Sequence, residues 1–403
     1  MFRARQTMTD ATETTSPEQV VFVRGVGSHN GGAELLLRAA QERLATDQVR
    51  IAADVRRVSA QLRQRWNIGG YLSVPKFGRL ESLGVDLLPM PVARGLDLYS
   101  GRHLSGVLDA SGFAIGDQWN PDSIRRDAAT FARLRQRGHP IVLLPQAFGP
   151  FDLPDVAAAS RELLGQVDLI CARDRESFAH VAALRGTDAG MLLCPDITIA
   201  LEAHTPTDAP AADPAADPSI ADRVAIVPNV NLANRSSDTD AAARYAAALL
   251  RIYRALAADG LSPFFLIHSA HGDPGVIAAV QAQQSDVEVI VPTDGLHAKR
   301  LIGECSGVIA GRYHALVSAL AQGVPAVAHS WSHKYGALLD DFGVNRGLVD
   351  PMDAEASVAE LRAIRSDAEY ASSLAAAKPR LVAEIDAVWT QVQTVLAQGR
   401  VNS

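Results

Sequence analysis

The sequence of 403 residues contains few cysteines and aromatic residues and has no excess of positive charge. Its three cysteines, Cys171, Cys194 and Cys305, are scattered, with no CxxC pair and no histidine at metal-ligand spacing. Each lies in or beside an apolar segment, which predicts small buried side chains in a reduced compartment. The formal net charge of −7 argues against a broad nucleic-acid surface, because such a surface needs a concentrated basic face.

Long apolar runs are also absent. No uninterrupted apolar segment approaches the roughly 20 residues that a transmembrane helix needs. Residues 1–19 are polar and rich in threonine, without the apolar stretch of a secretion signal, and they are predicted to be a disordered leader. We therefore expect a cytoplasmic protein that does not span a membrane, although it can dock on membrane-bound substrates.

The order of apolar and helical segments determines the expected fold class. Apolar strand-like runs alternate with helical patterns almost throughout, which is typical of βα units and a parallel sheet. We expect an α/β protein with two Rossmann-like, doubly wound domains facing a central cleft, followed by C-terminal helices. The predicted strands are residues 20–23, 49–53, 106–110, 141–145, 169–172 and 191–194 in the first domain, and residues 224–227, 264–268, 287–291, 308–310 and 326–329 in the second.

The composition also suggests where the domains end. Residues 204–222 are rich in proline, alanine and aspartate and have little to bury, so they are predicted to be a linker or an exposed loop. This gives an N-terminal domain at residues 20–203 and a C-terminal domain at 223–350. Residues 351–403 are predicted to be helical, with a break at Pro379.

Ligands of doubly wound sheets bind at the carboxyl ends of the strands, so the residues that directly follow strands are the candidates for function. Residues 25–34 follow the first strand and contain four glycines. Such a turn can bring backbone N–H groups close to an anion. Alternatively it is an ordinary βα turn, in which Asn30 caps the next helix and Glu34 favours its positive end.

Two further strand ends carry charged residues. Asp109 lies at the end of the strand at 106–110 and Asp117 follows that strand, where carboxylates can act as acid and base or orient sugar hydroxyls. Both can also simply form turns, and Asp109, closer to the strand, is the better candidate. Arg173 follows the strand at 169–172 and can meet a carboxylate or phosphate, or pair with a neighbouring aspartate.

The most informative segment is the turn that carries Arg312 and His314. It joins a strand to a helix, where the helix dipole, the free N–H groups and the side-chain charges all favour an anion. Either residue alone is usually structural, but both together indicate a functional site. Lys334, after the next strand, adds a cation, and Trp331 offers a flat face that is more often used for packing.

His268 also follows a strand and is predicted to line the cleft or to form hydrogen bonds. The segment His268-Ser-Ala-His-Gly-Asp273 has no spacing typical of a metal site. No metal and no cofactor is therefore predicted.

These segments, in this order, resemble the polysaccharide pyruvyl transferase family. Asn30-Gly-Gly-Ala-Glu34 is similar to its N-terminal turn, and Arg173-Asp-Arg-Glu-Ser177 to its central Arg-Asp-x-x-Ser. Arg312-Tyr-His-Ala315, with the later Lys334-Tyr335, is similar to its C-terminal Arg-x-His-Ala block. The resemblance covers residues 20–347 approximately. Family members carry Gly-Asp where this chain has Gly31-Gly32, which points to a subgroup with a different acceptor.

The resemblance implies a GT-B-like transferase that moves the enolpyruvyl unit of phosphoenolpyruvate to a sugar, closes a cyclic ketal and releases phosphate. It implies a role in the biosynthesis of exopolysaccharide or another cell-envelope glycan. The acceptor, a saccharide or lipid-linked saccharide, is expected on the N-terminal domain and the donor on the C-terminal domain. No nucleic acid is expected as a partner, and a homo-oligomer is compatible with the resemblance.

The resemblance also suggests roles for the candidate residues. The chemistry must protonate carbon 3 of the donor and remove two hydroxyl protons, and it needs cations for a phosphate and a carboxylate. His314 is the expected acid/base, Arg312 holds the donor, Lys334 and Arg173 are further anion ligands, Asp109 orients or deprotonates an acceptor hydroxyl, and Asn30, Glu34 and His268 contribute to substrate binding.

A nucleotide-sugar-dependent glycosyltransferase of the same architecture is the main alternative, since fold alone does not separate the two. Its usual mark is an acidic residue in the second domain that holds a ribose. The turn at Arg312 and His314 offers none, which favours a small, multiply charged donor. A non-catalytic sugar-binding protein is disfavoured because both residues are present.

Overall fold

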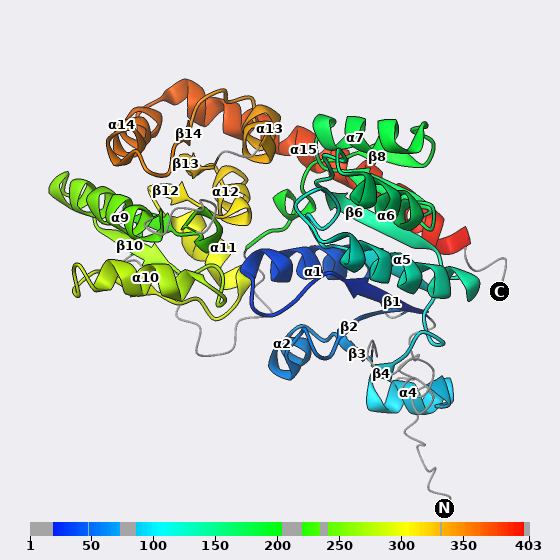
Figure 1. The fold of residues 1–403 in the computed structure, drawn as a ribbon. Coiled ribbons are helices and arrows are strands. Elements are labelled where there is room, and N and C mark those ends of the chain that lie inside the picture. Colours follow the sequence, from blue (N-terminus) through cyan, green and yellow to red (C-terminus); the bar gives the residue numbers. More distant parts are fainter. Residues whose placement is uncertain are drawn as a thin grey trace, which may run out of the picture.

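The computed structural model describes residues 19–46, 48–72, 86–203, 220–233, 241–330 and 333–398 (Figure 1). This part of the chain forms two parallel sheets with helices packed around them. The α/β fold class predicted from the alternating pattern is confirmed. Most of the predicted leader and of the predicted linker lies outside the described residues, but Gln19 already belongs to the first strand and Ile220 is buried.

The N-terminal sheet has eight strands in the order β4-β3-β2-β1-β5-β6-β7-β8, and neighbouring strands are parallel. The chain runs outward from β1 to β4 and then returns to the other side of β1. Its strands are β1 (Gln19–Arg24), β2 (Val49–Asp54), β3 (Gly69–Tyr71), β4 (Leu98–Tyr99), β5 (Gly106–Asp109), β6 (Ile141–Gln146), β7 (Leu169–Ala172) and β8 (Met191–Leu193).

The C-terminal sheet repeats this plan with six strands in the order β11-β10-β9-β12-β13-β14, again parallel. Here the chain runs outward from β9 and returns beside it at β12. The strands are β9 (Val224–Val227), β10 (Pro263–Leu266), β11 (Val289–Ile290), β12 (Gly307–Ala310), β13 (Ala326–His329) and β14 (Leu348–Val349).

The strand order places the candidate residues. In open parallel sheets the ligand site lies where the strand order reverses, because the loops on either side of that point diverge. The reversal falls between β1 and β5 in the first sheet and between β9 and β12 in the second. The turns that precede α1 (Gly31–Leu44) and α12 (Tyr313–Leu320) therefore start at these two points.

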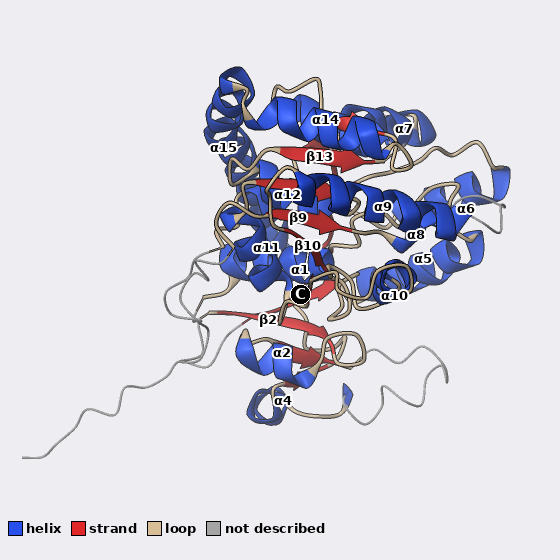
Figure 2. Ribbon diagram, turned by 90° about the vertical axis from the view of Figure 1, so that its left-hand side faces the viewer, coloured by secondary structure: helices blue, strands red, loops and turns tan. Residues whose placement is uncertain are grey.

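Helices cover both faces of the sheets (Figure 2). This is why strands such as β9 and β12 are apolar and fully buried along their length instead of alternating. Besides α1 and α12 the helices are α2 (Ala60–Arg65), α4 (Met90–Leu96), α5 (Pro121–Gln136), α6 (Pro154–Leu164), α7 (Arg175–Arg185), the 3₁₀ helix η1 (Ile197–Ile199), α8 (Val230–Ala233), α9 (Ala241–Ala258), α10 (Asp273–Gln281), α11 (Gly295–Glu304), α13 (His333–Asp341), α14 (Ala354–Arg365) and α15 (Ala368–Gln398).

The two sheets share one hydrophobic core. Buried side chains of α1 and η1 pack with those of α11 and α12 in a single cluster that reaches both sheets. A second cluster fills the other face of the N-terminal sheet. Because packed interiors deform little, the shared core fixes the carboxyl ends of the two sheets relative to each other.

The prediction of a helix break at Pro379 is wrong, since α15 runs through it. The break lies earlier, between α14 and α15. A row of buried apolar side chains continues on both sides of Pro379 and holds the helix in place despite the lost hydrogen bond. In Figure 1 this helix (red) extends to the N-terminal sheet, where Asp386 pairs with Arg43 at 2.6 Å and Leu396 packs near Gly106.

Three short strands, β3, β4 and β14, were not predicted, because two or three residues are too few to show a period of their own. The three cysteines are free and buried, as predicted. Burial raises the pKa of the Cys171 thiol to about 12, so this side chain serves as packing.

Candidate active site

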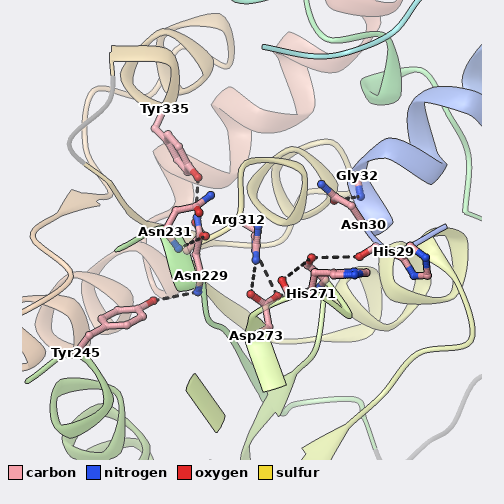
Figure 3. A network of polar contacts seen from close by, with 12 residues as sticks. His29, Asn30, Gly32, Asn229, Asn231, Tyr245, His271, Asp273, Arg312 and Tyr335 are labelled. Atoms are coloured by element: carbon pink, nitrogen blue, oxygen red, sulfur yellow. Dashed lines mark hydrogen bonds and ion pairs between the residues drawn. The ribbon is translucent and has the colours of Figure 1, made fainter. Parts of the chain in front are cut away.

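The loop between β1 and α1 forms a joint between the two domains (Figure 3). Asn30 pairs with Ser269 as an isolated antiparallel bridge. The Gly31 N–H donates to the His268 carbonyl at 2.9 Å, and the Ala270 N–H donates to the His29 carbonyl at 3.0 Å. The Asn30 side chain caps α1 by accepting from the Gly32 N–H at 3.0 Å. These N–H groups are therefore occupied within the protein, and the loop joins the domains through its backbone.

Glu34 extends this joint. Its carboxylate accepts from the Gly295 N–H at 2.6 Å, at the first turn of α11 in the other domain. Asp294, which caps α11, pairs with Arg65 at 2.5 Å. Burial raises the pKa of Glu34 to about 8, and Asp294 adds to the rise, whereas the Gly295 N–H and Arg65 oppose it. The structure thus assigns Glu34 a contact between the domains.

Glu34→Gln is expected to flatten the dependence of stability on pH. The folded-state pKa of Glu34 lies above the ordinary value of 4.5, so its contribution to stability is complete below that value and is lost as the pH rises through about 8. Glutamine keeps an oxygen acceptor for the Gly295 N–H but cannot ionise. Urea unfolding between about pH 5 and 9 should show a smaller decline for the variant than for the wild type. Glu42→Gln, on the same helix, is the control, and an unchanged decline in Glu34→Gln would contradict the assignment.

Arg312 is held by a buried aspartate at the turn after β12. Its Nε donates to Asp273 Oδ2 at 3.3 Å, and its Nη2 forms a closer ion pair with Oδ1. Asp273 also accepts from the Ser269 N–H at 2.9 Å, so the joint and the arginine share one carboxylate (Figure 3). Because Asp273 takes two of the five guanidinium N–H groups, Arg312 retains donors for a ligand.

Hydrogen bonds from buried side chains fix the backbone of the turn after β12. The Gly311 carbonyl accepts from Asn229 Nδ2 at 2.7 Å and from the Tyr335 hydroxyl at 2.9 Å. The Asn229 N–H in turn donates to the Tyr245 hydroxyl at 3.3 Å (Figure 3). Each of these side chains is buried. The network preorganises the turn from which Arg312 and His314 project.

His314 lies in the first turn of α12 and reaches the N-terminal domain. Its Nε2 is 3.4 Å from Oδ2 of Asp196, which follows β8. On its other side the imidazole covers Gly32, where an added Cβ would lie 2.2 Å from Nδ1. A glycine at position 32 is therefore a condition for this position of the histidine.

Asp196 is fully buried between the Arg173 guanidinium and the His314 imidazole. Besides His314 it pairs with Arg173, whose Nη1 lies 3.1 Å away, and it accepts from the Thr198 hydroxyl at 2.6 Å and the Thr198 N–H at 2.9 Å. Burial by itself would raise the pKa of Asp196, but His314, Arg173 and Thr198 together hold it well below its usual range. An ionised carboxylate therefore lies against the imidazole.

His268 is buried and, within the described part of the chain, its Nε2 has no hydrogen-bond partner. Burial lowers the pKa of His268 to about 3, and electrostatic interactions with the nearby side chains of His314 and Arg312 add to this effect. The imidazole is neutral at neutral pH, with one ring nitrogen available for a ligand. A buried unpaired polar atom is costly, which makes it a marker of a binding site.

Lys334 belongs to a group of aromatic and cationic side chains around Tyr313. Its Nζ lies 5.8 Å from the Tyr313 ring centre and 5.3 Å from that of Phe113, which belongs to the N-terminal domain. The Arg173 guanidinium stacks on Tyr313 at 4.0 Å. Tyr313 thus contacts both cations, and its ring lies edge-on to the His314 imidazole.

Asp109 forms its polar contacts within the N-terminal domain. Its carboxylate pairs with Arg24 at 2.8 Å and accepts from the Ser111 N–H at 2.9 Å, both within the N-terminal domain. These contacts fix the end of β5 and occupy both carboxylate oxygens. Asp117, at the other end of the same segment, accepts from the Asp152 N–H at 2.8 Å and fixes the loop.

The structure brings together residues that are remote in sequence. Arg312, His314, His268 and Asn30 converge at the joint, and Arg173 reaches His314 through Asp196. Sequence reasoning missed four residues of this site: Asp196, Asp273, Tyr313 and Gln146. Asp196 stands just after a predicted strand, so the rule that selected Arg173 also points to it. Gln146 ends β6, is fully buried and leaves both amide atoms unpaired among the described residues.

No group of three or more His, Cys, Asp or Glu side chains among the residues that the structure describes is arranged to hold a metal ion. None of the helices described is long and apolar enough to cross a membrane.

Comparison with solved structures identifies the fold. The UDP-GlcNAc 2-epimerase from Neisseria meningitidis, bound to UDP-GlcNAc, superposes with a TM-score of 0.60 at 12% identity, over 93% of this chain and 100% of that chain. HepE from Anabaena, in complex with UDP and glucose, gives 0.58 at 14% identity, over 94% and 99%. At such identities the likeness shows the fold alone, and it confirms the predicted GT-B-like architecture.

The family comparison is more specific. A family model described as polysaccharide pyruvyl transferase matches residues 30–333, well over half of the chain. No curated protein sequence matches the chain significantly. The matched region begins at Asn30 and extends past Arg312 and His314, so it contains the joint and both sides of the candidate site.

Proposed function

The chain belongs to the polysaccharide pyruvyl transferase family, and from this premise we propose that it transfers pyruvate from phosphoenolpyruvate to a sugar of a cell-surface glycan or its precursor. The product is a cyclic ketal, and phosphate is released. The observation that carries this proposal is the position of His314, which lies 3.4 Å from the ionised Asp196 and beside Arg312.

The charges of the site favour a small anionic donor. Arg312 retains guanidinium N–H groups and His268 an unpaired ring nitrogen, whereas Asp273 and Asp196 are already engaged with cations of the protein. The phosphate and the carboxylate of phosphoenolpyruvate would supply the missing negative charge. We assign the donor mainly to Arg312, with Lys334 as a further anion ligand and His268 as a neutral hydrogen-bond partner.

The reaction needs one proton delivered and two removed. Carbon 3 of the donor takes up a proton, a hydroxyl oxygen of the sugar bonds to carbon 2, and the bond from carbon 2 to the phosphate oxygen breaks. The second hydroxyl oxygen then bonds to carbon 2 and closes the ring. Of the two hydroxyl protons, one balances the proton on carbon 3 and the other leaves with phosphate. We assign this proton transfer to His314, which Asp196 orients.

The remaining candidates receive supporting roles. Arg173 is bound to Asp196 and positions it, which limits its use as a direct ligand of the donor. Asn30 and Glu34 hold the two domains together at the site. The pairing of Asp109 with Arg24 disfavours a role as a base, but each carboxylate oxygen can accept a second hydrogen bond, so we assign Asp109 to orienting an acceptor hydroxyl on the N-terminal side.

Phosphate release from phosphoenolpyruvate, with a panel of glycans and lipid-linked sugars, tests the proposal. We expect release that depends on the acceptor, together with a ketal methyl signal in the proton NMR spectrum of the product. Arg312→Ala is expected to abolish both, because it removes the main ligand of the donor. Val291→Ala, a change at an exposed side chain of the C-terminal domain, is the control.

A nucleotide-sugar-dependent glycosyltransferase is the other outcome that the same experiment can reveal. Calorimetry would then show binding of a nucleotide sugar and none of phosphoenolpyruvate. That result would contradict the proposed donor while leaving the fold assignment unchanged.

A further inference from the structure

Two aromatic side chains, Phe113 and Trp119, lie on the loop that joins β5 to α5. Their ring centres are 6.1 Å apart and the rings are nearly perpendicular. Trp119 is 41% exposed, whereas Trp66 and Trp389 are 3% and 4% exposed. An exposed tryptophan keeps a large apolar face in water. It therefore contributes less to the stability of the protein than a buried tryptophan does.

The loop that carries Trp119 is firmly held. The Asp117 carboxylate accepts from the backbone N–H groups of Asp152 and Leu153, at 2.8 and 3.3 Å. The backbone N–H of Trp119 donates to the Gly116 carbonyl at 3.0 Å, and the following residue, Asn120, caps α5. The exposed ring is therefore attached to a preorganised backbone, which lowers the entropy lost when a ligand binds.

The same aromatic pair is continuous with the candidate active site. Phe113 contacts Lys334 of the other domain, and Lys334 contacts Tyr313. The Tyr313 ring lies edge-on to the His314 imidazole, with ring centres 5.5 Å apart. Each side chain touches the next from the exposed tryptophan to the proposed acid/base.

We propose that Trp119 and Phe113 form the surface on which the acceptor sugar lies, an inference that rests on the proposed function. One face of a pyranose ring carries C–H groups and is apolar, while its hydroxyl groups project from the edge. An aromatic face holds such a ring and leaves the hydroxyls free to react. The two domains then share the substrates: the sugar stacks on the β5–α5 loop, and the donor binds at Arg312.

The test separates binding of the acceptor from binding of the donor. In steady-state assays Trp119→Ala is expected to raise the KM for the acceptor about tenfold and to leave the KM for phosphoenolpyruvate unchanged, as expected for loss of one aromatic contact. Trp119→Phe, which keeps a flat ring, should stay within about threefold of the wild type. Val291→Ala is the matched control, since its side chain is also exposed and apolar but lies in the other domain.

A second measurement keeps the inference independent of turnover. Saturation-transfer NMR with methyl glycosides of galactose, glucose, mannose and N-acetylmannosamine detects sugar binding directly. A signal that is present in the wild type and in Val291→Ala but lost in Trp119→Ala supports the inference, even if no phosphate release is found and the proposed function fails. Equal signals in the wild type and in Trp119→Ala, or none from the wild type, would overturn it. An equal rise of both KM values would overturn it as well.

Discussion

His314→Gln is expected to lower kcat for phosphate release by about two to four orders of magnitude, the usual contribution of a general acid/base. Glutamine fills similar space and forms hydrogen bonds, but it does not transfer a proton. The contacts of Asp196 with Arg173 and Thr198 do not involve the imidazole, so the fold should persist. Initial rates at saturating donor and acceptor, together with circular dichroism, give the comparison.

A second variant tests the same histidine without changing it. In Gly32→Ala the new Cβ would lie 2.2 Å from Nδ1 and 3.1 Å from Cβ of His314, so the imidazole must leave its present position. Alanine is a better helix former than glycine, so α1 itself gains stability while kcat falls. Gly95→Ala is the matched control, because a Cβ at this helical glycine meets nothing within 4 Å. If His314→Gln kept turnover within about threefold of the wild type, the role of His314 as acid/base would be refuted.

Asp196→Asn is expected to destabilise the protein by about 3–5 kcal/mol, which is typical when one partner of a buried ion pair is removed. The fully buried carboxylate is the ion-pair partner of Arg173, itself only 4% exposed, and asparagine leaves that guanidinium charge buried without this partner. Urea unfolding measures the loss. Asp259→Asn is the control: its pair with Arg362 lies at the surface, and such pairs contribute at most about 1 kcal/mol.

The double variant Arg173→Gln, Asp196→Asn separates charge from packing. Removing both charges should recover part of the stability, because no uncompensated charge stays buried. Turnover should remain low, since His314 still lacks its carboxylate. Equal losses of stability in Asp196→Asn and Asp259→Asn would contradict this prediction, because the buried pair would then contribute no more to the free energy of unfolding than the surface pair.

The candidate residues differ in how well the sequence predicted them. The turn with Arg312 and His314 was identified because its strand, its helix and its charges are adjacent in the chain. Most strands of both parallel sheets were also predicted, because apolar runs and helical patterns are local features of the sequence. The partners of these residues were not predicted, because Asp273 and Asp196 reach them only through the packing of different strands.

Local patterns also left alternatives that only contacts could resolve. The glycines near Asn30 suggested an anion site, but their N–H groups meet His268 and the Asn30 side chain. Asp109 stands at a strand end, as a base would, yet it pairs with Arg24. Trp331 lies outside the described residues, whereas the exposed tryptophan that the structure places near the site is Trp119.

The sequence by itself determined the class of the fold, most of the strands that build it and the charged turn at Arg312 and His314. These features depend on neighbours within a few positions, so the chain records them locally. The tertiary structure decided which charges meet: Asp196 with His314 and Arg173, Asp273 with Arg312, and Glu34 with the N–H of Gly295. Such pairings are set by how the two sheets and their helices pack, which no periodicity in the sequence encodes.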